Sequence, residues 1–132
     1  YTQQHQDIRT ENGIAYGDTF EHVNFGYAKK LTAVNAITMA SLALAPPAPE
    51  MVAIGVIVQA SAKLKWNKVN GAKGYKIYWR DTTSPTWDHS RYVEETKFTL
   101  DGIVIDNFFF GVAAVGEHGH ESVVVFPNKI MR

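Results

Sequence analysis

The sequence predicts a mainly β fold: an antiparallel β-sandwich of seven strands, preceded by a loop and one α-helix. From residue 51 onward, apolar and polar residues alternate in short runs, as in strands with one buried face. Turn signals such as Asn70-Gly71 and Asp101-Gly102 separate the runs at intervals of about 8–12 residues, which is typical of sandwiches. An apolar stretch of helical periodicity comes before them and is ended by prolines.

The predicted strands place large apolar residues at every second position, so each strand has one face suited to a core. We expect Trp66, Phe108 and Phe110 to lie in this core. The expected strands are 52–58, 62–67, 75–80, 91–93, 98–100, 107–115 and 122–126.

The predicted helix covers residues 25–44. Asn24 is a suitable N-cap, and Pro46 and Pro47 restrict the residue before them, so the helix should end near Leu44. Its polar face is thin, and we therefore expect it to need a partner on more than one side. One expected apolar face consists of Tyr27, Leu31, Val34, Thr38 and Leu42, at helical spacing.

The composition is globular and carries no charge bias. Of 132 residues, 45% are hydrophobic and 20% charged, and 13 basic and 13 acidic residues give zero net charge. This balance argues against a general nucleic-acid binder and against a polybasic membrane address. The lack of cysteine excludes disulfides and cysteine-ligated zinc. No apolar run reaches the ~20 residues that span a bilayer, so we expect no membrane span.

Residues 48–132 resemble a fibronectin type III domain, an immunoglobulin-like sandwich. The resemblance is carried by the prolines before the first strand, by Trp66, by the run from Gly74 to Arg80, by Leu100 and by Ala114-Val115. The corner tyrosine of that family falls on Phe108 here. Because phenylalanine lacks the hydroxyl, the resemblance implies a local difference at this corner.

Residues 1–45 resemble the C-terminal end of the catalytic domain of secreted zinc-dependent aminopeptidases, the di-zinc exopeptidases related to leucine aminopeptidase and glutamate carboxypeptidase. The residues that carry the resemblance are the run from Tyr1 to Asp7, Tyr16-Gly17-Asp18 and the run from Val23 to Tyr27, followed by the Ala-rich helix. It implies that His5 supplies the last zinc ligand and that the other ligands lie upstream of Tyr1. The alternative is a solvent-exposed histidine near a terminus.

Together the two resemblances imply a C-terminal fragment of a secreted zinc-dependent aminopeptidase that is not catalytically competent alone. The implied organisation is the end of a peptidase domain over 1–45, a Pro-rich linker over 46–50 and the sandwich over 51–132. Zinc is expected in the intact protein and no cofactor in this chain. The expected partners are the upstream peptidase domain and peptide substrates. Self-association through the helix is a further possibility.

The implied location is secreted, periplasmic or at the cell envelope. The chain begins at Tyr1 with a polar stretch, so we expect no signal peptide in it and expect it to be a piece of a longer protein.

Two groups in the second half are candidate binding surfaces. The first is an aromatic platform for a sugar or a peptide, formed by Trp87 and Tyr92 with Tyr78 and Trp79. Trp87 is expected to be its exposed member. The alternative is local packing of a long loop. The second is a pair of histidines, His118 and His120, which could chelate a metal ion together with the flanking Glu117 and Glu121. The alternative is that these residues form only a polar loop between two strands.

Two other functions remain open. One is a free-standing, non-catalytic binding module whose helix packs on its own sandwich, and the other is a structural spacer. Burial of the helix face within the chain would favour the binding module, because a helix cut from a peptidase domain lacks its own sheet.

Overall fold

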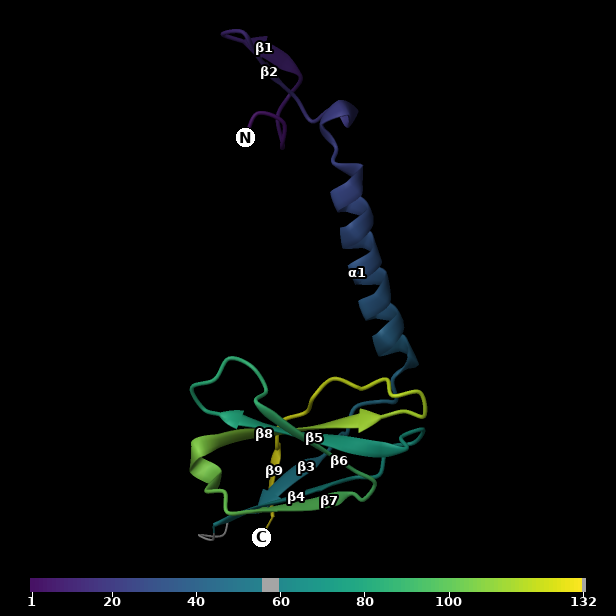
Figure 1. Cartoon of the computed structure of the whole chain (residues 1–132), viewed down its shortest axis with the longest axis vertical. Helices are drawn as coiled ribbons and strands as arrows, with labels where there is room; N and C mark the ends of the chain where they lie inside the picture. Colours follow the sequence, from purple (N-terminus) through teal and green to yellow (C-terminus); the bar gives the residue numbers. More distant parts are fainter. Residues whose placement is uncertain (56–59, 132) are drawn as a thin grey trace. The chain divides into compact units, whose positions relative to one another are not determined.

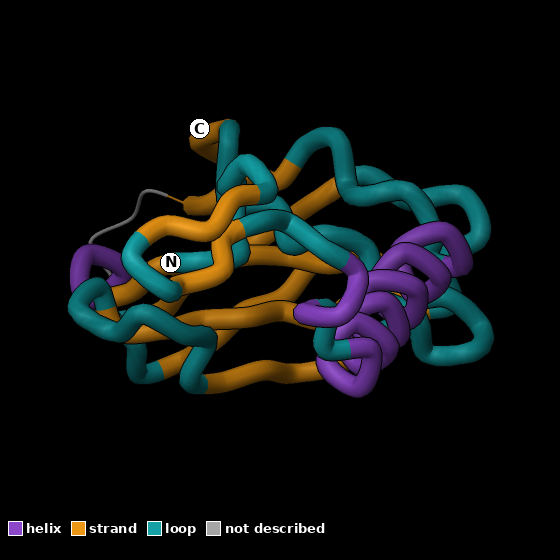
Figure 2. The backbone as a smooth tube through the Cα atoms, turned by 90° about the horizontal axis from the view of Figure 1, so that it is seen from above, coloured by secondary structure: helices purple, strands orange, loops and turns teal. Residues whose placement is uncertain are grey.

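The structure is a computed structural model that describes residues 1–55 and 60–131. The chain divides into two compact units, Tyr1–Thr38 and Met39–Arg132. The long helix α1, Phe25–Leu44, spans the division between them (Figure 1). In Figure 2, α1 and the two 3-10 turns, Phe20–His22 and Ile105–Asn107, are the purple segments.

The first unit contains a β-hairpin where the sequence analysis predicted only loop. Strand β1, Arg9–Glu11, pairs antiparallel with β2, Ile14–Tyr16. The two turn residues, Asn12 and Gly13, have φ values of +50° and +76°. A two-residue hairpin turn of this hand requires positive φ at both positions, which Asn-Gly supplies. Asn12-Gly13 is therefore a local sequence signal for this hairpin.

Helix α1 confirms the predicted bounds, 25–44. The Asn24 Oδ1 accepts a hydrogen bond of 2.9 Å from the backbone N–H of Tyr27, which is the geometry of an N-cap. No residue of the helix is buried, and the expected face of Tyr27, Leu31 and Leu42 is at least half exposed. Val34, on the same face, is also exposed, and other exposed apolar residues lie around the rest of the circumference, namely Phe25, Ile37, Met39 and Leu44. In the described part of the chain, no helix is both long and apolar enough to cross a membrane.

The second unit is a sandwich of a four-stranded and a three-stranded sheet (Figure 1). The larger sheet has the order β7-β4-β3-β9, and the smaller has the order β6-β5-β8. The strands of the larger sheet are β3 Val52–Gly55, β4 Ser61–Trp66, β7 Lys97–Asp101 and β9 Lys129–Met131. Those of the smaller sheet are β5 Gly74–Asp81, β6 His89–Val93 and β8 Phe108–Val115.

The core lies between the inner faces of these two sheets. Leu64 and Trp66 of β4 face Ile77 of β5 and Phe110 of β8, and each is at most 3% exposed. The Trp66 ring meets the Tyr75 ring edge-on at 5.3 Å. Full burial of each large side chain contributes about 1.5–3 kcal/mol. The predicted core positions of Trp66 and Phe110 are confirmed, and Phe108 packs on the core while only partly buried.

The last part of the sandwich differs from the prediction. The predicted strand 122–126 is absent, and residues 121–126 make two isolated bridges instead, Val112 with Val125 and Val115 with Glu121. Strand β9 was not predicted, and it pairs parallel with β3, so the expectation of purely antiparallel sheets is wrong there. Between Val125, which bridges to β8, and Lys129, which pairs with β3, the chain passes from one sheet to the other. Pro127 lies in this passage and has no N–H to donate to a sheet. Asn128 then docks on Val52: its N–H donates to the Val52 carbonyl at 2.9 Å, and its Oδ1 accepts from the Val52 N–H at 3.2 Å.

The described residues hold nine strands: seven in the second unit and two in the hairpin. The predicted strand 52–58 is present as β3 up to Gly55, and residues 56–58 lie outside the described residues. At the corner before Phe108, the 3-10 turn Ile105–Asn107 leads into β8.

Gly111→Ala should destabilise the sandwich, because a Cβ there would collide with Val124 and lie 3.1 Å from the Trp87 Cη2. We expect the free energy of unfolding, measured with urea, to fall by about 1–3 kcal/mol. In a Val124→Ala background the same change should cost much less, because the colliding methyl group is gone. An equal cost in both backgrounds would contradict this account.

Candidate functional site

An aromatic cluster lies on the outer face of the three-stranded sheet. We call it the outer aromatic cluster and define it as Tyr78, Trp87, Phe109 and Phe126. The Trp87 ring is 5.7 Å from the Tyr78 ring and 5.4 Å from the Phe126 ring. The Phe126 ring meets the Phe109 ring edge-on at 6.3 Å. Three segments far apart in the sequence thus share one apolar surface.

The position of Trp87 follows from the strand register. Tyr78 of β5 is paired with Gly111 of β8, and the missing side chain leaves a slot over the sheet. Trp87, from the loop between β5 and β6, fills this slot beside Val124. Trp87 is consequently half-buried instead of exposed as expected. The exposed members of the cluster are Phe109 and Phe126, at 42% and 48%.

Arg80 contacts the outer aromatic cluster and links the loop that carries Trp87 to the sheet. Its guanidinium lies 4.7 Å from the Phe109 ring centre and 5.6 Å from that of Trp87, both within cation–π range. It also donates a hydrogen bond to the Ser84 carbonyl. At the start of the loop, hydrogen bonds from the Thr83 backbone N–H and hydroxyl hold the pKa of Asp81 below its ordinary value. The loop is therefore fixed by polar contacts as well as by Trp87.

Beside the cluster, Glu121 binds two side chains of β5. The Lys76 Nζ donates to Glu121 Oε1 at 2.9 Å, and the Tyr78 hydroxyl donates to Glu121 Oε2. The hydrogen bond to Glu121 raises the pKa of Lys76. Burial is the main cause that raises the pKa of Tyr78, and its bond to Glu121 adds to it. These bonds attach the segment after β8 to the sheet.

The structure brings only part of the predicted platform together. Tyr78 and Trp87 are in contact, whereas Trp79 lies on the inner side of β5 and stacks on His89 at 5.2 Å. Tyr92 is 45% exposed and lies against Gly74. The sequence analysis missed Phe109 and Phe126. Phe109 had a usable signal, because its parity is opposite to that of the core residues Phe108 and Phe110.

His118 and His120 lie in the loop after β8, where the Gly116 N–H donates to the His120 carbonyl at 2.9 Å. Their neighbour Glu121 is engaged with Lys76 and Tyr78. Across residues 1–55 and 60–131, no three His, Asp or Glu residues are grouped so that they could hold a metal ion.

His5 lies in an N-terminal loop held by three hydrogen bonds. The Gly17 N–H donates to the Thr2 carbonyl at 3.1 Å, and the Asp18 N–H donates to the Gln6 carbonyl at 3.2 Å. The His5 N–H in turn donates to Asp18 Oδ2 at 3.3 Å. His5 has a φ of +54°, in the left-handed region, and its side chain is exposed. The loop thus fixes the backbone of His5 and leaves its imidazole accessible.

Comparison with solved structures identifies the fold of the second unit. An Fn3-like protein from Clostridium thermocellum matches with a TM-score of 0.52 and 21% identity, over 67% of this chain and 96% of its own. The structure of titin kinase and its flanking domains matches with a TM-score of 0.54 and 20% identity, over 64% of this chain and 16% of its own. The second unit has the fibronectin type III fold. At these identities the likeness shows the fold alone.

The sequence similarity to curated proteins extends over both units of the chain. A protein named "Probable zinc metalloprotease" from Pyrenophora tritici-repentis is 38% identical over 130 residues, which is 96% of this chain and 27% of the relative. A protein of the same name from Pyricularia oryzae is 34% identical over 134 residues, again 96% of this chain and 27% of the relative. The chain therefore spans about a quarter of the length of these relatives. No family model matches it.

The stability of the fibronectin type III unit should fall as the pH rises above about 10. The pKa values of Lys76 and Tyr78 in the folded protein lie above their ordinary values of 10.5 and 10.0. The folded state therefore binds these protons more tightly than the unfolded chain. The resulting stabilisation is complete below pH 10 and is lost as the pH passes the raised values.

Glu121→Gln should reduce this fall, because it removes the charge that both groups contact. Urea unfolding between about pH 8 and pH 11 measures the effect. Glu95→Gln, which removes an exposed pair with Lys97 (3.7 Å), is the control and should follow the unchanged protein. If Glu121→Gln also followed the unchanged protein, the raised pKa values would have another cause.

Proposed function

We propose that this chain is the C-terminal part of a zinc-dependent aminopeptidase. In this proposal residues 1–45 complete the peptidase domain, and the fibronectin type III unit is an accessory domain. The main support is the similarity to proteins named probable zinc metalloproteases, which extends over 96% of the chain and includes both units. The narrower assignment to aminopeptidases rests on the residues around His5, Asp18 and Asn24 that resemble that family.

His5 is the residue of this chain that we assign to the zinc site. A neutral imidazole is a common zinc ligand. The exposed side chain and the fixed backbone of His5 fit that role. Asp18 orients the loop through its bond to the His5 N–H. In this proposal, the remaining ligands come from the part of the protein upstream of Tyr1. Bound zinc would lower the pKa of its water and polarise the scissile carbonyl.

Helix α1 fits a segment that belongs inside a larger domain. Apolar side chains lie on all its sides, and helices of that type are stable when they are covered. In the proposed protein, the upstream peptidase domain covers them. The fibronectin type III unit would then follow as an appendage that contacts substrate or the peptidase domain through its own surfaces. We further propose that the protein is secreted, which fractionation of cells expressing the complete coding sequence would test.

The complete protein should lose activity when His5 is replaced. In the full-length protein, His5→Ala should reduce hydrolysis of an aminoacyl-nitroanilide at least about 100-fold, because zinc-bound chemistry needs its full ligand set. It should also lower the zinc content measured by atomic emission. His22→Ala is the matched control: this histidine is also exposed in the first unit, and its Nδ1 lies 2.8 Å from Thr19 Oγ1. It should leave both measurements unchanged.

Three results would contradict the proposal. Full activity and zinc content in His5→Ala would remove His5 from the site. Hydrolysis of internal but not N-terminal peptide bonds by the full-length protein would exclude an aminopeptidase while leaving a zinc protease. Turnover by the 132-residue chain alone would show that the active site lies within it.

A free-standing binding module is the second candidate. One observation favours it: Phe109 and Phe126 are exposed next to each other on the outer aromatic cluster, as in a contact surface. A coding sequence that lacked further His, Asp and Glu ligands upstream of Tyr1 would select this candidate over the peptidase.

A further inference from the structure

Four lysines gather on the outer face of the four-stranded sheet. We call this surface the lysine face and define it as Lys63, Lys65, Lys97 and Lys129. Lys65 of β4 is paired directly with Lys97 of β7, and Ala53 of β3 is paired with both Lys65 and Lys129. Paired residues on neighbouring strands point to the same side. This chain, whose net charge is zero, therefore concentrates positive charge on one sheet face.

Protection of sheet edges explains only two of these lysines. Lysine on an edge strand hinders pairing with another chain, and β7 and β9 are the two edges of this sheet. Strand β4 is an interior strand, so Lys63 and Lys65 protect no edge. Like charges directly opposite each other on a sheet are destabilising. The Lys65–Lys97 pair thus lowers the stability of the sheet, and neither edge protection nor packing of the sandwich accounts for Lys65.

Little negative charge offsets the lysine face. Among the outward positions of β3, β4, β7 and β9, Asp101 is the one acidic residue, and it is paired with Ser61. Within residues 1–55 and 60–131, Lys97 has an ion pair with Glu95 at 3.7 Å, and Lys63, Lys65 and Lys129 have none. Both members of the Glu95–Lys97 pair are exposed, and such pairs contribute little.

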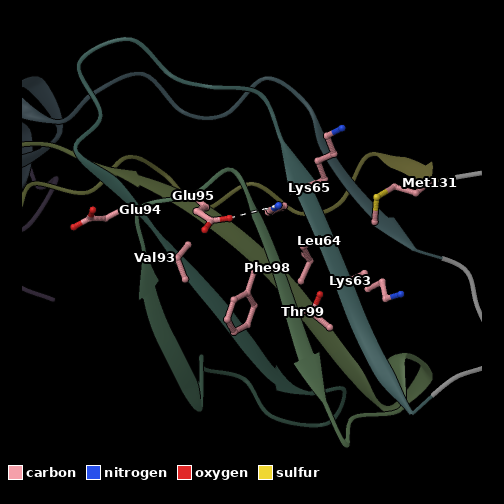
Figure 3. A pocket seen from close by; sticks show the side chains of 10 residues that line it. Lys63, Leu64, Lys65, Val93, Glu94, Glu95, Phe98, Thr99 and Met131 are labelled. Carbon is pink, nitrogen blue, oxygen red and sulfur yellow. Dashed lines mark ion pairs between the residues drawn. The ribbon is translucent and has the colours of Figure 1, made fainter.

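An open groove of about 770 Å³ lies along this surface, which is within the size range of ligand clefts. Lys63, Lys65 and Lys97 line it together with Phe98. Figure 3 shows Lys63 and Lys65 extending from the same strand, and its dashed line marks the bond between Glu95 and Lys97. Glu94 and Glu95 lie where β6 turns into β7, and they are the acidic residues among those that line the groove.

We propose that the lysine face binds an extended acidic peptide segment of a partner protein, with carboxylates at alternate residues. Lys63 and Lys65 are two residues apart on one strand, which places their Cα atoms about 6.6–7 Å apart. Alternate residues of an extended peptide repeat at the same distance. Each carboxylate of such a segment would meet one lysine of β4, and Lys97 would add a second cation beside Lys65. This inference does not depend on the proposed peptidase activity.

The binding test uses the whole chain and a fluorescent peptide of alternating Glu and Ser residues, followed by fluorescence anisotropy. Lys63→Glu/Lys65→Glu should weaken binding at least about tenfold, because attraction becomes repulsion. Lys68→Glu/Lys73→Glu is the matched control. It changes the net charge equally at two exposed lysines outside the lysine face and should weaken binding less than about twofold. Raising the ionic strength should weaken binding to the unchanged protein.

Three outcomes would overturn the proposal: no binding of the peptide, equal weakening by both double variants, or binding of a peptide with the same Glu residues in one block as tightly as the alternating peptide. Heparin and vesicles containing phosphatidylserine test the other polyanions. If either bound through Lys63 and Lys65 more tightly than the alternating peptide, the occupant would not be a peptide.

A stability measurement separates a binding role from a structural role. Lys65→Glu should raise the midpoint of thermal unfolding of the free chain by about 1–4 °C, because it replaces repulsion by attraction to Lys97. The same variant should bind the alternating peptide more weakly. A lower midpoint would show that Lys65 serves the fold, and the proposal would fail.

Discussion

The packing of Trp66 against Tyr75 determines which side of each strand faces water. Side chains alternate along a strand, so once Leu64 and Trp66 point inward, Lys63 and Lys65 must point outward. The same holds on the opposite sheet, where burial of Tyr75 and Ile77 places Tyr78 on the outside. Both outer surfaces therefore follow from one core, and a shift of one residue in either register would exchange core and surface together.

The sequence was informative wherever local chemistry decides the structure. Asn24 and the prolines after residue 44 define α1, because capping and the loss of an amide donor act within a few residues. The positions of β4, β5 and β8 followed from alternation for the same reason. The parallel pairing of β9 with β3 depends instead on a crossing at residues 127–128 and on contacts some 76 positions apart. No local pattern contains that information.

In the candidate sites, too, residue types could be predicted from the sequence, whereas contacts between distant segments could not. Tyr78 and Trp87 could be named from their residue types, but their partners Phe109 and Phe126 come from other strands or loops. The slot that receives Trp87 exists because Gly111 is paired with Tyr78. This pairing depends on the register of β5 and β8, which no local sequence pattern specifies. The two outer faces also differ in kind. Segments of the same chain cover one with aromatic rings. The other presents four lysines, of which Lys97 alone has an ion pair within the described residues.

The lysine face has a consequence for the way this protein meets other molecules. Because 13 positive and 13 negative residues of this chain cancel, the field that they produce at a distance is that of a dipole, which falls with distance faster than that of a net charge. At physiological salt, screening confines even this field to about 8 Å. A partner is thus attracted to the lysine face only after a close approach in the correct orientation.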